Sequence, residues 1–289
     1  MKKKSLFLLF FFVFFSLFAA EINWRKAEDV QTGVKLLKFS EEKPRLMKIN
    51  LMRIDLDTPG LYFTATGRDA DWGKPMPDQK NFTIRTKRIR TRDFMKNARK
   101  DHHNMIVAVN AAPWVPWEVP FTHKYADPLG VNIFNGEIIS NNAQTVAFVV
   151  YKNGKREFTT KLPESKYNDV LVAVSGFFPI LKKGKILPHQ DNLAPRVAFG
   201  LSRNRRYLYI LTVDGRQKNW SMGATMKELA QYLLDAGAYD GINMDGGGSS
   251  TLIYWDDSKN KPVSLVRHTE SGYERPVGSN IGICLKNKK

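Results

Sequence analysis

The chain contains almost no cysteine, since Cys284 is the only one in 289 residues. A single cysteine excludes a disulfide within the chain and a metal cluster held by several thiolates. Long apolar runs are also scarce. The one at residues 6–18 is shorter than the ~18 to 20 residues that a membrane-spanning helix needs. The fold must therefore be stabilised by a hydrophobic core.

Residues 1–20 have the pattern of a secretory signal. Three lysines at positions 2–4 precede the apolar run, and Ala19 and Ala20 follow it. Phe18 stands where a cleavage site needs a small residue, so a retained N-terminal anchor is the alternative. We expect a signal at residues 1–20, a mature chain at residues 21–289, and a secreted or periplasmic protein.

Acidic residues are few relative to basic ones. The chain has 45 Lys and Arg against 28 Asp and Glu, and its formal charge of +17 falls to +14 once the three lysines of the signal are removed. A basic surface concentrates anions, which predicts anionic glycans or a loose association with an anionic membrane or envelope surface. Simple solubility is the alternative reading of the charge.

Repeats, low-complexity linkers and Pro/Ser-rich stretches are absent from residues 21–289, which favours one domain. Short apolar runs from residue 46 onward predict strands, and Asn135-Gly136, Asn153-Gly154 and Lys183-Gly184 predict hairpins. Two helices are expected, one near residues 91–100 and one from the capping box at Thr225 to Gly237. Residues 67–83 and 112–128 are expected to be long surface loops. The predicted fold is α+β, a single domain with a mixed, mostly antiparallel β-sheet core covered by a few helices.

The stretch GINMDGGGSSTLIYW, residues 241–255, places Asp245 and three glycines between two predicted strands. Glycines at such a turn expose backbone N–H groups that can bind oxyanions. The Gly-Lys-Ser/Thr ending of a phosphate loop and the Gly-x-Ser-x-Gly of a nucleophile elbow are both absent. A glycine-rich hairpin with a solvated aspartate is the alternative.

Other polar residues also flank predicted strands. A carboxylate beside a guanidinium can hold a phosphate-bearing sugar, because Arg donates paired hydrogen bonds while the acid moves protons. The alternative for each of these positions is a surface ion pair. The positions are Asn110, Arg196, Asp214, Arg216, Glu274 and Arg275.

Three segments in order, PRVAFG, VDGRQKNWSMGATMKELAQYLLDAGAYDGINMDGGGSSTLIY and ERPVGSNIGICL, resemble the phosphodiester glycosidase family. The similarity runs from about residue 110 to residue 285. This chain has NAAPWVPW where the family usually has an Asn-Gly-Gly-Phe-Phe-like stretch.

The resemblance implies hydrolysis of the bond between the anomeric carbon of an N-acetylglucosamine-like sugar and a phosphodiester oxygen, in a glycan or envelope polymer. It implies Asp245 as the acid or base, with Asp214 or Glu274 as its counterpart. No cofactor is expected, and calcium is the less favoured alternative because no Asp-x-Asp-x-Asp spacing occurs. The residues expected to bind substrate are Asn110, Arg196, Arg216, Arg275, the amides of Gly246, Gly247 and Gly248, and Ser249.

Two other classes of function stay open. The first is an exported binding module for phosphorylated or anionic envelope glycans, in which the Trp-Val-Pro-Trp motif at residues 114–117 and Trp72 would stack on sugars. The second is nucleic-acid binding by the basic residues at positions 85–100. The export signal makes nucleic acid an unsuitable partner.

Overall fold

The structure is a computed structural model that describes residues 22–118, 122–190, 192–268 and 272–286. The expected signal at residues 1–20 lies outside this part of the chain. None of the helices among the described residues is both long enough and apolar enough to cross a membrane.

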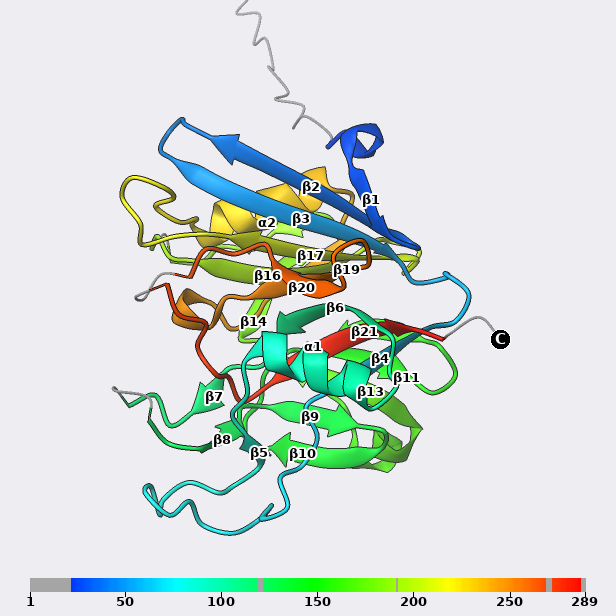
Figure 1. Ribbon diagram of the computed structural model, residues 1–289, viewed down its shortest axis with the longest axis vertical. Coiled ribbons are helices and arrows are strands. Elements are labelled where there is room, and N and C mark those ends of the chain that lie inside the picture. Colours follow the sequence, from blue (N-terminus) through cyan, green and yellow to red (C-terminus); the bar gives the residue numbers. More distant parts are fainter. Residues whose placement is uncertain (1–21, 119–121, 191, 269–271, 287–289) are drawn as a thin grey trace, which may run out of the picture.

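The largest sheet has eight strands and forms the upper layer in Figure 1. Its order is β1-β2-β3-β17-β16-β18-β14-β15, and all of its ladders are antiparallel. The strands are β1 (Glu28–Gln31), β2 (Val34–Glu41), β3 (Met47–Asp55), β14 (Phe178–Lys182), β15 (Lys185–Ile186), β16 (Arg196–Leu201), β17 (Tyr207–Val213) and β18 (Asp240–Asn243).

Three smaller antiparallel sheets complete the β structure. The first has the order β20-β19-β6-β21-β4, the second β10-β9-β13-β11-β12 and the third β5-β8-β7. Their strands are β4 (Leu61–Ala65), β5 (Thr86–Lys87), β6 (Met105–Asn110), β7 (Trp114–Val115), β8 (Tyr125–Pro128), β9 (Val131–Phe134), β10 (Glu137–Asn141), β11 (Ala147–Tyr151), β12 (Arg156–Thr159), β13 (Val170–Ser175), β19 (Leu252–Asp256), β20 (Lys261–Ser264) and β21 (Asn280–Leu285).

Within the described ranges, two α-helices cover the outer faces of the sheets. Helix α2 (Met226–Asp235) packs on the eight-stranded sheet through Leu229 and Leu233, and its expected capping box at Thr225 is formed. Helix α1 (Thr91–Lys100) lies over β6 and β21 and buries Met95 against them (Figure 1). Short 3₁₀ helices are η1 (Trp24–Lys26), η2 (Glu164–Asp169) and η3 (Gly247–Ser249).

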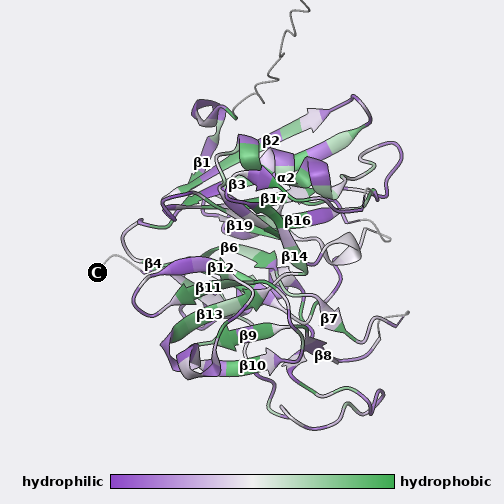
Figure 2. Cartoon of the chain, turned by 180° about the vertical axis from the view of Figure 1, so that it is seen from behind, coloured by the Kyte–Doolittle hydropathy of each residue, from purple (hydrophilic) through white to green (hydrophobic). Residues whose placement is uncertain are grey.

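The main hydrophobic core lies between the three larger sheets. Phe148 of β11 is fully buried and contacts Phe63 of β4 and Phe199 of β16, with ring centroids 5.8 and 6.1 Å apart. These three rings come from three different sheets. Figure 2 shows hydrophobic residues along strands such as β13, while hydrophilic residues dominate the connecting loops.

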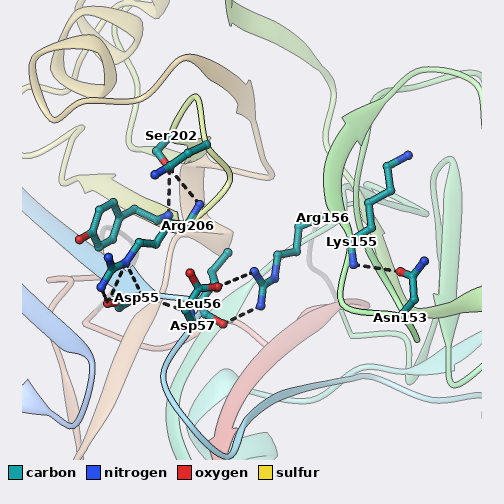
Figure 3. Close-up of polar contacts among 10 residues, drawn as sticks. Asp55, Leu56, Asp57, Asn153, Lys155, Arg156, Ser202 and Arg206 are labelled. Carbon is teal, nitrogen blue, oxygen red and sulfur yellow. Dashed lines mark hydrogen bonds and ion pairs between the residues drawn. The ribbon is translucent and has the colours of Figure 1, made fainter.

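Polar contacts also join the eight-stranded sheet to β12. Arg156 donates from Nη2 to the carbonyl oxygen of Leu56 at 2.6 Å, and its Nη1 lies 3.1 Å from Asp57 (Figure 3). Beside them, Arg206 donates hydrogen bonds from Nε and Nη2 to the Asp55 carboxylate. Arg156 and Arg206 together therefore stabilise the end of β3 and the turn that follows it.

The antiparallel β-rich character predicted from the sequence is confirmed, and so are both helices and all three hairpins. Asn135 and Gly136 adopt φ values of 52° and 82°, as a two-residue hairpin turn requires. Every ladder among the described residues is antiparallel, so the sheets are less mixed than expected. The division of residues 21–289 into domains stays a prediction.

Two expectations about local structure were wrong. Residues 112–128 are not simply a surface loop, because β7 and β8 lie within them and Trp114 is buried against Ala126 and Val277. The first strands also begin earlier than expected, at β1 and β2, where alternation with charged residues hid the apolar face. Residues 67–83 do form a largely irregular loop, with a single bridge between Pro75 and Thr83.

Candidate active site

Asp245 follows the inner strand β18 after one intervening residue, Met244, and begins the turn that contains the three glycines. Its backbone N–H donates to Ala111 O at 3.1 Å. Asn110, at the end of β6, donates from Nδ2 to Asp245 O at 2.7 Å and accepts from the N–H of Thr251 at 2.9 Å. Asn110 therefore clamps both ends of the glycine turn, and both ends of its side-chain amide are engaged by protein.

The glycines of this turn allow close packing that other residues would prevent. Gly247 has φ of +59°, a left-handed conformation that favours glycine. A Cβ on Gly246 would lie 2.8 Å from Pro195 O. The N–H of Gly247 donates to that same carbonyl at 2.9 Å, so this amide is not free to bind a ligand as expected.

The Asp245 carboxyl group is buried, with 8% of the residue exposed. Loss of solvation raises its pKa from the ordinary 3.8 to about 7, although Ser249, Arg275, the Gly246 amide and Trp114 all favour the ionised form. A carboxyl group that titrates near neutral pH suits proton transfer.

Two of the expected arginines lie on the glycines themselves. A Cβ on Gly247 would lie 3.5 Å from Nη1 of Arg216, and a Cβ on Gly248 would lie 2.6 Å from Cζ of Arg275. Arg275 also acts electrostatically on Asp245. A side chain at position 248 would therefore displace the guanidinium of Arg275, whereas Arg216 lies at ordinary contact distance from position 247.

Arg196, at the start of β16, lies beside Arg216. It donates to Ala224 O at 3.1 Å and to both the backbone and side-chain oxygens of Asn192 at 2.7 Å. Burial and the charge of Arg216 lower the pKa of Arg196. Two like charges held near each other favour a bound anion, which would relieve their repulsion.

A second group of residues lies on the Arg275 side of the turn and was not expected at this site. The guanidinium of Arg88 lies over the Trp114 ring, 4.7 Å from its centroid, and burial together with Arg275 lowers the pKa of Arg88 to about 10. His123 packs against the Trp114 ring with centroids 5.9 Å apart. The sequence did contain a sign of this group: the NAAPW stretch, where the chain departs from the family pattern, ends in Trp114.

Asp214 and Glu274 have hydrogen-bond partners other than Asp245, and their role as its counterpart stays a prediction. Asp214 accepts from Nε1 of Trp220 at 2.7 Å and from the N–H of Arg267 at 3.3 Å, and burial raises its pKa to about 6. Glu274 accepts from the N–H of Arg92 at 2.8 Å. Because Arg92 is in the first turn of α1, Glu274 caps that helix.

The basic stretch at residues 85–100 is largely occupied by internal contacts. Arg90 bonds Asp93 at 2.6 Å, Arg92 lies 3.3 Å from Glu274, and Arg99 donates to Asn104 at 2.7 Å. Its charges therefore support α1 and its surroundings.

The tryptophans expected to stack on sugars differ in exposure. Trp114 is buried, and the guanidinium groups of Arg68 and Arg85 lie 3.8 and 4.8 Å from the centroid of the Trp72 ring. Trp117 is 53% exposed and lies 6.0 Å from the ring of Phe177. Trp117 alone of these three offers a largely open ring.

No group of three or more His, Cys, Asp or Glu side chains in the described ranges is arranged to hold a metal ion. The expectation that the protein needs no metal or other cofactor stays a prediction.

The antiparallel fold, the buried aspartate and the arginines on its glycine turn define the class of protein. The chain belongs to the phosphodiester glycosidase family, whose model matches residues 103–284. No curated protein matches it.

Solved structures share the fold. The catalytic domain of zebrafish N-acetylglucosamine-1-phosphodiester α-N-acetylglucosaminidase, auto-inhibited by its pro-peptide, is 18% identical, with a TM-score of 0.61 over 93% of this chain and 87% of that chain. A hypothetical protein from Synechocystis is 13% identical, with a TM-score of 0.60 over 90% and 64%. A putative exported protein from Burkholderia pseudomallei is 11% identical, with a TM-score of 0.52 over 83% and 74%.

Proposed function

We propose that this protein hydrolyses a sugar 1-phosphodiester, with N-acetylglucosamine or a similar sugar on the phosphate. The observation that supports this most directly is the placement of the buried Asp245 beside Arg275, on a turn whose Gly247 lies next to the guanidinium of Arg216. A carboxyl group that titrates near pH 7 beside an anion-binding set of arginines matches the needs of this reaction.

In the proposed reaction the bond between the anomeric carbon and the bridging phosphodiester oxygen breaks. The phosphate monoester leaves with the electron pair of that bond, stabilised by Arg216, Arg196 and Arg275. A water oxygen bonds to the anomeric carbon, and Asp245 accepts one of its protons. Because the departing phosphate is already a stable anion, it needs little protonation, so the base is the more demanding role.

The substrate is proposed to lie in a secreted or envelope glycan. Support comes from the signal pattern at residues 1–20 and from the formal charge of +14 that remains once the three lysines of the signal are removed, which favours anionic polymers.

The test is hydrolysis of N-acetylglucosamine 1-(4-nitrophenyl phosphate) in water enriched in oxygen-18. We expect the label in the sugar hydroxyl and unlabelled 4-nitrophenyl phosphate, because the carbon–oxygen bond breaks. Asp245→Asn should lower kcat by about 10²- to 10⁴-fold, which is the usual contribution of an acid–base group.

A matched control is Asp127→Asn, since Asp127 is also buried, has a pKa raised to about 6 and bonds Asn142. This variant should keep its activity. Label in the phosphate would instead show a phosphodiesterase. Tight binding of the substrate without any product would favour the binding module, whose open Trp117 ring could stack on a sugar.

A further inference from the structure

A cavity of about 390 Å³ lies on the α2 side of the eight-stranded sheet, beside Arg196. It is lined by Phe177, Phe178, His189, Gln190, Asn192, Arg196, Met226 and Asn243. Its volume is within the roughly 300–1,000 Å³ of sites for small molecules.

The register of the sheet explains why these side chains meet. Asn243 of β18 pairs with Phe178 on one side and with Ala198 on the other. Paired residues of antiparallel strands point to the same face, and Arg196 is two residues from Ala198, so it shares that face. Met226, the first residue of α2, lines the cavity beside these strand residues.

Asn243 is the unusual member of this row. It is 3% exposed, yet its Oδ1 has no hydrogen-bond partner among the residues that the structure describes. A buried amide oxygen without a donor costs stability, and such groups are rare in folded proteins. Asn243 also lines the cavity, so a donor bound there would lie beside a residue that lacks a partner for this oxygen.

The other walls suit a sugar ring. Phe178 and His189 stack with centroids 4.3 Å apart and planes 24° apart, and His189 donates from Nε2 to Pro179 O at 2.8 Å, which fixes its ring. Aromatic rings make apolar contacts with the carbon atoms of a sugar ring, and neighbouring amide and guanidinium groups form hydrogen bonds with its substituents. Arg196 lines this cavity and lies near Arg216, whose guanidinium is next to Gly247.

We propose that this cavity binds a hydroxylated ring attached directly to the phosphate, with Asn243 Oδ1 accepting from an N–H or O–H of that ring. The inference rests on the proposed function in placing the phosphate at Arg196 and Arg216. The ring comes either from the sugar whose anomeric carbon bears the phosphate or from the alcohol on its other side.

The test is calorimetric titration of Asn243→Ala with three probes: inorganic phosphate, N-acetylglucosamine 1-phosphate and glucose 6-phosphate. Phosphate should bind as to the wild type. Loss of one hydrogen bond should weaken one sugar phosphate about threefold to tenfold. Weakening of the 1-phosphate places the glycosyl ring in the cavity, and weakening of the 6-phosphate places the alcohol there. Unchanged affinity for both, or equal weakening of phosphate itself, overturns the proposal.

A matched control is Asn50→Ala in the same sheet, since Asn50 is buried but donates to Thr212 at 3.4 Å and to Leu265 O at 3.0 Å. Asn50→Ala should lower Tm and leave binding unchanged, while Asn243→Ala should not lower Tm. An Asn243→Ala protein as unstable as the control would show a structural amide and overturn the proposal. If the variant does not fold, Phe178→Leu should weaken the same sugar phosphate without affecting phosphate.

Titration with these probes requires no turnover. A wild type that binds them through Asn243 but hydrolyses nothing would refute the proposed function alone. An active enzyme indifferent to Asn243→Ala would refute the cavity alone.

Discussion

Asp245 combines burial with several groups that stabilise its ionised form. Burial is the largest influence on its pKa and raises it, while Ser249 and Arg275 lower it. The pKa of about 7 is the balance of these opposed effects. A small change in any neighbour should therefore move the titration through the neutral range.

The first prediction concerns the pH dependence of activity. If the Asp245 carboxylate is the base, kcat/KM should fall about tenfold for each pH unit below about 7, since only the ionised form accepts a proton. The measurement is kcat/KM for the sugar phosphodiester across the range from mildly acidic to mildly basic pH. A rate that falls as pH rises above the pKa instead would assign Asp245 the role of a general acid.

The same group gives a second prediction, on stability. Unfolded Asp245 ionises near 3.8, whereas the native residue keeps its proton up to about 7, so unfolding releases a proton between these values. Stability should therefore decrease as pH rises through that window. Asp245→Asn should have a higher Tm than the wild type above this window and a similar Tm below it. Equal Tm differences on both sides of the window would contradict the raised pKa.

Gly248 gives a third prediction at this scale. A Cβ there would lie 2.6 Å from Cζ of Arg275, and this guanidinium ends a flexible side chain that can move aside. Gly248→Ala should fold normally but raise KM by about tenfold or more, because a charge-assisted hydrogen bond to phosphate contributes about 1.5 to 3 kcal/mol. Gly67→Ala is the control, since its nearest contact would be 3.9 Å from Phe134. An unchanged KM for Gly248→Ala would remove Arg275 from the phosphate site.

At the scale of single elements, the two helices are capped differently at their N-termini. Helix α2 is capped locally by Thr225 and Glu228. Helix α1 begins at Thr91, and the side chain of its N-cap residue Arg90 makes no capping bond. Glu274, which lies 182 residues away from Arg92 in the sequence, accepts from the N–H of Arg92 instead. The long-range cap therefore ties the segment that carries Arg275 to helix α1.

This arrangement predicts the effect of Glu274→Ala. The variant should lose about 1.5 to 3 kcal/mol of unfolding free energy, the contribution of a hydrogen bond to a charged group, while its turnover stays within about threefold of the wild type. Urea unfolding and steady-state kinetics would measure both. Turnover that drops by a factor of about a hundred in a variant of normal stability would restore Glu274 as a counterpart of Asp245.

At the scale of the whole molecule, residues from distant parts of the chain converge on one turn. Trp114 and Arg275 act on Asp245, Arg88 lies beside both of them, and Arg196 lies beside Arg216 next to Gly247. The contacts that hold the sheets together therefore support the site from a distance.

Arg156 tests this support. Arg156→Ala removes the bonds to Leu56 O and Asp57 that join β12 to the turn after β3, and should cost about 1 to 2 kcal/mol. Lys155→Ala is the control, because Lys155 is exposed and pairs with Glu157 within the same strand region. Chemical denaturation would compare the two, and equal stabilities would show that the contact contributes nothing.

The sequence by itself determined the local features of this protein. These features are the capping box at Thr225, the hairpin glycines and the apolar alternation. Each depends on residues a few positions apart, so it can be predicted from the sequence. The motif order around DGGGSS likewise identified the family and named Asp245, Arg196, Arg216 and Arg275.

Only the tertiary structure decided which polar residues become neighbours. It placed Glu274 on a helix end, Asp214 beside Trp220, and Trp114 beside Asp245. Strand order and register set these neighbourhoods, and they depend on how the sheets bury their apolar faces together. Burial also decided the pKa of Asp245, since no sequence pattern states how much water a carboxyl group loses on folding.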